Sequence, residues 1–204
     1  MSTLTNTLKN TFKLTLLGAL CATSAFAGPG TDFLKQKVTK VRELAARPTP
    51  NAKVKAEVDA ELMKVIVPVM NFPKMSQAAL GKRWGEATEA QRTRFMALFQ
   101  ELVFHSYMKR IRSANDGSSV EYIDEMPAEG GGIEVEAEAK TKKMEIELRF
   151  KLAPLKEGFE VADVVIDEVS LVNNYREQFA KIITAEGFEA LLSKMEAQVK
   201  KVKG

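Results

Sequence analysis

The chain has little of the side-chain chemistry on which catalysis and metal binding depend. Its 204 residues include one histidine and one cysteine, which excludes a zinc site built from His/Cys clusters and any internal disulfide. Neither sign of charge is in large excess, because 30 Lys and Arg residues stand against 27 Asp and Glu residues. A net charge of +3 gives no global attraction to nucleic acid. We therefore expect no metal, no cofactor and no nucleic-acid partner.

What is present is the composition of a folded globular chain. Hydrophobic residues make up 45% and charged residues 28% of the sequence, which excludes a disordered or collagen-like chain. The length fits one domain.

Residues 1–27 have the pattern of a secretory signal peptide. Two lysines precede an apolar run from Leu14 to Phe26, and Ala25-Phe26-Ala27 is the small-x-small sequence that precedes a cleavage site. We predict cleavage after Ala27, which leaves residues 28–204 as one mature domain with a net charge of +1. The sequence therefore predicts a protein that is soluble on the far side of an inner membrane.

Two alternatives to a cleaved signal peptide are a retained membrane anchor and a lipoprotein. The apolar run is shorter than the roughly 20 apolar residues that a transmembrane helix needs, which disfavours a retained anchor. Cys21 would carry the lipid of a lipoprotein, but Leu20 precedes it, where a lipobox requires a small side chain.

Helical spacing of apolar residues predicts helices on both sides of a central strand region. The capping box Thr88-Glu89-Ala90-Gln91 opens the longest pattern, which continues through Ile111. The predicted helices cover residues 31–45 with Thr31 as cap, 52–67, 73–80, 89–111, 175–185 and 188–202.

The period changes from 3.6 to 2 after Ser118. Ile133, Val135, Ala137 and Ala139 alternate with glutamates, and a similar alternation runs from Met144 to Leu152. Clean alternation is typical of antiparallel strands with one apolar and one solvated face. With further strands at 120–126 and 159–166, the sequence predicts a curved four-strand antiparallel meander in which 130–132 is a hairpin loop. This order of elements predicts an α+β domain with helices covering the sheet's apolar face.

The residues offer poor material for an active site. His105 lies alone within the longest predicted helix, and the strand carboxylates alternate outward beside basic residues, as on a solvated surface. A small enzyme would have to use Asp163, Tyr122 or His105 as acid or base, with at least one of them pointing inward with a perturbed pKa.

Apolar residues are instead expected in two opposing layers. One is the inner face of the sheet, and the other is a helical wall that includes Phe95, Phe99, Leu102, Val103 and Met108. These layers are either a filled core, as in a non-catalytic interaction module, or the walls of a ligand cavity. Composition alone leaves both interpretations open.

Two separated stretches of the mature chain carry a recognisable pattern. The first contains 71–75 (NFPKM), 79–84 (ALGKRW), 87–92 (ATEAQR) and 95–99 (FMALF), and the second is 164–179 (VVIDEVSLVNNYREQF). Together they resemble the MlaC, or toluene-tolerance, family of periplasmic phospholipid carriers. Three positions depart from that family's pattern: Phe159 where tryptophan is common, Asn71 where aspartate is frequent and Glu168 where glycine is frequent.

The resemblance implies an NTF2-like fold with an acyl-chain cavity between sheet and helices. It also implies a soluble periplasmic carrier, not an enzyme, which shuttles phospholipid between an outer-membrane lipoprotein complex and an inner-membrane ABC transporter with a lipid-binding ring. We expect a monomer whose ligand is phospholipid.

For the cavity lining we predict apolar residues from both layers: Val65, Phe72, Met75, Phe99, Leu102, Val103, Val135, Ala137, Ile146, Leu148, Phe150 and Val165. Tyr175 and Arg176 match the second stretch of the family. Arg176 either contacts phosphate at the mouth or clamps the sheet to the following helix. Trp84 either rims the opening or anchors the loop after Gly81.

Overall fold

The structure is a computed structural model that describes residues 28–114, 119–141 and 145–203. The predicted signal peptide and Met144 lie outside these residues. The described helices are α1 (Pro29–Ala45), α2 (Ala52–Ile66), α3 (Phe72–Leu80), α4 (Arg83–Glu86), α5 (Glu89–Ala114), α6 (Leu171–Glu186) and α7 (Phe188–Lys203). The described strands are β1 (Ser119–Pro127), β2 (Ile133–Lys140), β3 (Glu145–Pro154), β4 (Phe159–Ile166) and β5 (Val169–Ser170).

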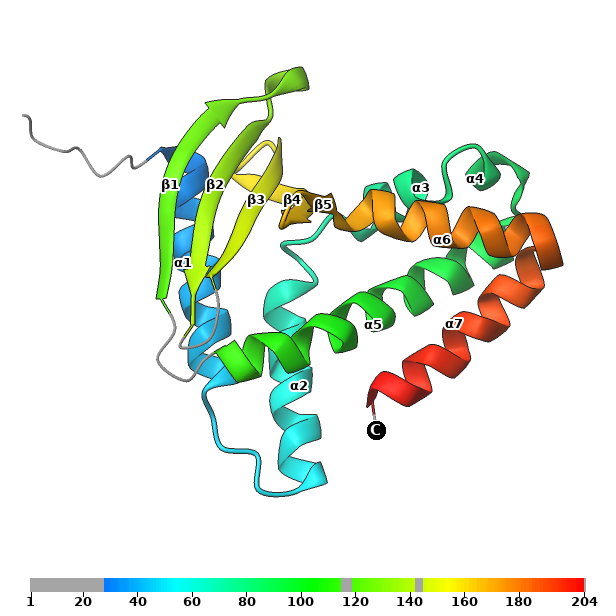
Figure 1. The fold of residues 1–204 in the computed structure, drawn as a ribbon, viewed down its shortest axis with the longest axis horizontal. Helices are drawn as coiled ribbons and strands as arrows, with labels where there is room; N and C mark the ends of the chain where they lie inside the picture. The colour runs from blue at the N-terminus through cyan, green and yellow to red at the C-terminus, as the bar shows by residue number, and fades with distance from the viewer. Residues whose placement is uncertain (1–27, 115–118, 142–144, 204) are drawn as a thin grey trace, which may run out of the picture.

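The strands form one antiparallel meander in the order β1-β2-β3-β4-β5, which curves but does not close (Figure 1). This confirms the predicted α+β class and the four long strands. The two residues of β5 were not predicted, because two residues are too few to show an alternation. α4 was missed for a similar reason, since four residues make only one turn.

The sheet has one apolar and one charged face, as its alternation predicts. Val135 of β2 stands opposite Phe150 of β3, whereas the next residue, Glu136, stands opposite Arg149. On the charged face Arg149 lies 3.1 Å from Glu136 and within 4 Å of Glu134 and Glu168.

α1 packs on the apolar face of the sheet, and it lies closest to the strands at Gly30. A Cβ atom built on Gly30 would lie 3.0–3.2 Å from side-chain atoms of Leu152, Ile133 and Val135. A larger residue would push α1 off the sheet, so glycine permits this close approach. Behind the strands in Figure 1, α1 runs along β1 and β2.

A carboxylate from β1 ties the first turn of α1 to the sheet. Glu125 accepts hydrogen bonds from the Thr31 backbone N–H (2.7 Å), the Thr31 hydroxyl (2.7 Å) and the Gly30 N–H (3.3 Å). The prediction that Thr31 caps this helix was therefore wrong, because the helix begins at Pro29 and Thr31 is a buried donor to Glu125. A carboxylate also opposes the positive end of the helix dipole.

The buried apolar residues divide into three clusters, named here by position. The helical cluster joins α3, α5, α6 and α7 and includes Phe95, Phe99 and Phe179. The hinge cluster joins α1, α2 and α5 through Leu44, Leu62 and Met108. The sheet cluster joins α1 to the strands through Leu34, Val135, Leu152 and Val161.

This division corrects the expectation that one helical wall faces the sheet. Phe95, Phe99, Leu102 and Val103 of α5 pack in the helical cluster, against α3, α6 and α7. Met108 lies further along α5 in the hinge cluster. The apolar face of α5 is wide because different helices bury different parts of it.

The turn between β4 and β5 carries backbone strain. Asp167 and Glu168 have φ angles of +46° and +65°, the left-handed conformation that non-glycine residues adopt at a cost. Two successive positive φ angles are those of a type I′ hairpin turn, for which Asp-Gly is a favoured sequence. Glu168 thus departs from the family pattern at a position where glycine would be less strained.

We predict that Glu125→Ala loosens α1. The substitution leaves two backbone N–H groups and a buried hydroxyl without their acceptor, so the free energy of unfolding should fall by about 1–3 kcal/mol. Urea denaturation measures this loss. Glu121→Ala, on the exposed side of the same strand, is the control and should change stability by less than about 0.5 kcal/mol. Equal stability of the two variants would contradict the claim that Glu125 stabilises the packing of α1 on the sheet.

Candidate functional site

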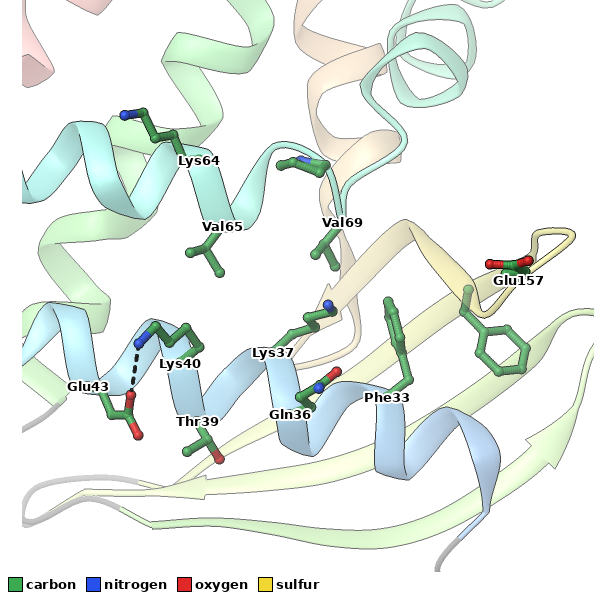
Figure 2. A pocket seen from close by; sticks show the side chains of 12 residues that line it. Phe33, Gln36, Lys37, Thr39, Lys40, Glu43, Lys64, Val65, Val69 and Glu157 are labelled. Atoms are coloured by element: carbon green, nitrogen blue, oxygen red, sulfur yellow. Dashed lines mark hydrogen bonds and ion pairs between the residues drawn. The ribbon is translucent and has the colours of Figure 1, made fainter.

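A groove of about 630 Å³ lies between α1 and α2 (Figure 2). Its walls come from α1, from the end of α2 and the residues after it, and from the hairpin between β3 and β4. The lining residues are Phe33, Gln36, Lys37, Thr39, Lys40, Glu43, Lys64, Val65, Pro68, Val69, Glu157 and Phe159.

The groove exists because the two ends of α1 pack on different partners. Near its C-terminus, Leu44 joins Val58 and Leu62 of α2 in the hinge cluster. Near its N-terminus, Leu34 packs in the sheet cluster instead. The chain after α2 is fixed to the sheet as well, because the Val161 N–H donates to the Val69 carbonyl at 2.8 Å. The groove therefore lies at the boundary between the hinge cluster and the sheet cluster.

Part of the apolar sheet face is left uncovered by these clusters. Ile146, Leu148 and Ile166 lie on the same face as Val135 by register, yet each is only half-buried. Among the described residues, none of the three belongs to the helical, hinge or sheet cluster. They provide apolar surface on the helix-facing side of β3 and β4.

Three lysines line the groove, and they differ in their surroundings. Lys40 pairs with Glu43 at 3.4 Å. The side chain of Lys64 extends away from the space between the helices, whereas that of Lys37 extends into it (Figure 2). The Lys37 ammonium lies 5.7 Å from the centroid of the Phe33 ring, a distance at which a cation is attracted to the ring face.

The structure distributes the predicted lining residues among several places. Phe72, Met75, Phe99, Leu102 and Val103 come together, but with one another in the helical cluster. Val135 and Phe150 are in or against the sheet cluster, and Val65 lines the groove. Ala137 is buried, and Ile146 and Leu148 share its face of the sheet.

Val165 is the exception among the sheet residues. Its partner in the register is Arg149, so its side chain lies on the charged face. A bulge causes this: Lys151 pairs with Asp163 and Leu152 with Val161, which leaves Ala162 as an extra residue. The alternation of β4 side chains between the two faces shifts by one residue at this bulge. Val164, not Val165, therefore packs against the sheet cluster.

Tyr175 and Arg176 lie on α6, away from the groove lining. The Tyr175 ring packs against Phe99 and Phe179, with ring centroids 5.2 and 5.4 Å apart, and burial raises the pKa of its hydroxyl. Arg176 is exposed, and its Cδ lies 3.7 Å from the position of a Cβ built on Gly81. Arg176 thus lies against the end of α3, not at the mouth of this groove.

Trp84 is fixed by Arg92. The Arg92 Nε donates to the Trp84 carbonyl at 2.9 Å, and the guanidinium lies 5.4 Å from the indole centroid. The indole is half-buried against the helical cluster. This is the anchoring arrangement expected for the segment after Gly81.

Comparison with known proteins decides the family. The model of the family described as MlaC protein matches residues 35–197, most of the chain. The chain belongs to the MlaC family. No curated protein matches it.

A solved structure shares the fold of this MlaC-family chain. It is the phospholipid-binding protein from Ralstonia solanacearum, in complex with a phospholipid. The two are 20% identical and superpose with a TM-score of 0.76, over 86% of this chain and 99% of the other. Across the part of the chain that the structure describes, no helix has the length and apolar character to cross a membrane.

The candidate acids and bases lie outside the groove lining. Asp163 accepts from the Ser170 hydroxyl (2.6 Å) and the Val172 N–H (3.1 Å), which fixes the start of α6. Tyr122 points toward α1, but burial raises its pKa to about 12, so its hydroxyl stays protonated at neutral pH and is no base. Within the described residues, no group of three or more His, Cys, Asp or Glu side chains is placed to hold a metal.

Of the 12 residues that line the groove, the sequence predicted only Val65 and missed the rest, among them Phe33, Lys37, Val69 and Phe159. One signal was available. Lys37 falls in the apolar phase of α1, between Leu34 and Val41, where a charged side chain is unusual. Val69 and Phe159 carry no such local signal, because only tertiary contacts bring them to α1.

We predict that the single histidine makes stability depend on pH. Burial, more than any other influence, lowers the pKa of His105 below its ordinary value of 6.5, and the nearby Lys203 ammonium acts in the same direction against Glu101. The unfolded chain therefore binds a proton more readily than the folded chain. The free energy of unfolding should fall as pH drops below 6.5, with a slope of at most about 1.4 kcal/mol per pH unit, and this contribution should level off below the folded pKa.

Urea denaturation between pH 7.5 and 5 measures the effect, and the one imidazole resonance in the NMR spectrum gives the pKa directly. His105→Gln should remove this part of the pH dependence. An imidazole pKa above 6.5 in the folded protein would contradict the assignment.

Proposed function

We propose that this protein is a periplasmic phospholipid carrier that holds acyl chains against the apolar face of its sheet. The observation that carries the proposal is the uncovered apolar surface of Ile146, Leu148 and Ile166, on the side of the sheet that faces the helices and the groove. Membership of the MlaC family and the fold shared with a phospholipid-bound protein support it. Val65, Ala137 and Phe150 complete the proposed acyl-chain contacts.

The size of the hydrophobic effect explains why a carrier is needed. Two acyl chains contain about 30 methylene groups, so moving them from a bilayer into water costs roughly 25 kcal/mol at about 0.8 kcal/mol per methylene. Free diffusion across an aqueous compartment is negligible at that cost. An apolar slot that resembles the bilayer makes the exchange between membrane and protein nearly isoenergetic. The direction of transport must then come from a partner that hydrolyses ATP.

The proposed cellular role follows from the predicted export signal and the family resemblance. Cleavage after Ala27 would release residues 28–204 into the periplasm. There the protein would shuttle between an outer-membrane lipoprotein complex and an inner-membrane ABC transporter with a lipid-binding ring. The catalytic candidates lie away from the groove, which favours a carrier over a small enzyme that would use the same surface.

We predict that gently purified protein retains phospholipid and that its removal lowers the melting temperature. Ligand that binds only the folded state stabilises it by about 2.7 kcal/mol at a hundredfold excess over Kd. Native mass spectrometry identifies the bound lipid, and calorimetry before and after delipidation measures the shift. A lipid-free protein that also fails to take up phospholipid from vesicles would refute the carrier function.

We predict that Leu148→Trp impairs lipid capture. The indole fills apolar space on the inner face, and overpacking of about 1–3 kcal/mol should reduce bound phospholipid by roughly tenfold. Met126→Trp is the matched control, because Met126 is 38% exposed in β1 and stands opposite Glu134, on the charged face. Both variants are compared by circular dichroism and by lipid extraction. Equal lipid content in two folded variants would refute the inner-face assignment.

A further inference from the structure

Lys37 occupies a position where the helix pattern calls for an apolar residue. It lies one turn after Phe33 and one turn before Val41, and it is half-buried. Lys35 and Lys40 of the same helix are exposed. A methionine would fill the same space without desolvating a charge.

The ammonium of Lys37 lacks an anionic partner among the described residues. The ammonium instead lies 5.7 Å from the centroid of the Phe33 ring. The two carboxylates of the groove do not supply one: Glu43 pairs with Lys40, and Glu157 has no ion pair with a described lysine. In Figure 2 the Lys40 side chain turns along α1 toward Glu43 and the Lys64 side chain points away from α1, whereas the Lys37 side chain extends into the space between α1 and α2.

The surroundings indicate the chemistry of the missing anion. Val65, Val69 and the Phe33 and Phe159 rings form the apolar part of a groove whose other lining residues are polar or charged. A half-buried, unpaired cation beside such an apolar part suits an amphiphile that carries an anion next to its chains. Lysine binds phosphate as a flexible point charge with three donors, which matches the phosphodiester of a lipid headgroup.

We propose that Lys37 binds the phosphate of the bound lipid and makes the protein select phosphate-bearing diacyl lipids over diacylglycerol with the same chains. This rests on the proposed carrier function. It assigns headgroup recognition to α1, whereas the acyl chains contact the sheet. The selection acts on the phosphate itself, so phosphatidic acid, phosphatidylglycerol and phosphatidylethanolamine all satisfy it.

The test is a competition for delipidated protein. Vesicles of equal parts phosphatidic acid and diacylglycerol with identical acyl chains are the donor, and extracted lipid is quantified by mass spectrometry. The wild type should prefer phosphatidic acid by about tenfold or more, the ratio expected for one charge-assisted hydrogen bond. Lys37→Met should lower the preference to near one. Lys37→Arg should keep most of it, and the preference should shrink at high salt.

Lys40→Met is the matched control, because Lys40 lines the same groove but is paired with Glu43. It should retain the wild-type preference. Lys37→Met is expected to fold, since the position lies in the apolar phase of α1. If its circular dichroism differs from the wild type, Lys37→Gln takes its place.

Each outcome bears on a different claim. A wild type that captures neither lipid overturns the carrier function and this inference together. A wild type that captures both lipids equally, or a Lys37→Met variant with unchanged preference, overturns the role of Lys37 and leaves the carrier function standing. Inorganic phosphate separates a headgroup from a free anion. If inorganic phosphate raised the melting temperature of the wild type but not of Lys37→Met, Lys37 would be a free-phosphate site and the lipid assignment would fail.

Discussion

The apolar face of the sheet is wider than the one helix that lies along it. Neighbouring strands are about 4.8 Å apart, so four long strands and their side chains present a face of roughly 15–20 Å. A helix with its side chains is about 10–12 Å across. α1 therefore covers the part near β1 and β2, where Gly30 permits a close approach. The half-buried residues Ile146, Leu148 and Ile166 of β3 and β4 lie outside the three apolar clusters.

α5 is the element that relates the sheet side of the molecule to the helical side. With 26 residues it is about 39 Å long at 1.5 Å per residue, and its apolar residues serve two clusters in succession. Its first half is buried by α3, α6 and α7, and its second half by α1 and α2. The helical cluster contains most of the large aromatic side chains of the described residues, whereas Phe33 and Phe159 line the groove together with Val65 and Val69.

Caps and elements that depend on residues close together in the sequence were predictable. Caps, bulges and packing partners that depend on residues far apart in the sequence were not. The capping box is an example of the first kind: the Gln91 N–H donates to the Thr88 hydroxyl at 3.2 Å, and the Thr88 N–H to the Gln91 side chain at 2.9 Å. The cap of α1 is of the second kind, because Glu125 lies 94 residues beyond Thr31. Alternation located β4 correctly but misplaced Val165, since a bulge leaves no mark in the hydrophobic pattern. Periodicity also identified the apolar stripe of α5 without saying which neighbours bury it.

Three separate clusters have a consequence for how the molecule can move. A protein with one continuous core opens only by losing much of its stability, whereas contiguous cooperative units can open one at a time. Here the N-terminal part of α1 could lift from the strands by giving up its contacts in the sheet cluster and its hydrogen bonds to Glu125, while the hinge cluster and the aromatic packing of α3, α5, α6 and α7 stayed intact. Binding and release of a lipid would then require only a sub-global fluctuation of one helix, and the rest of the chain would stay folded.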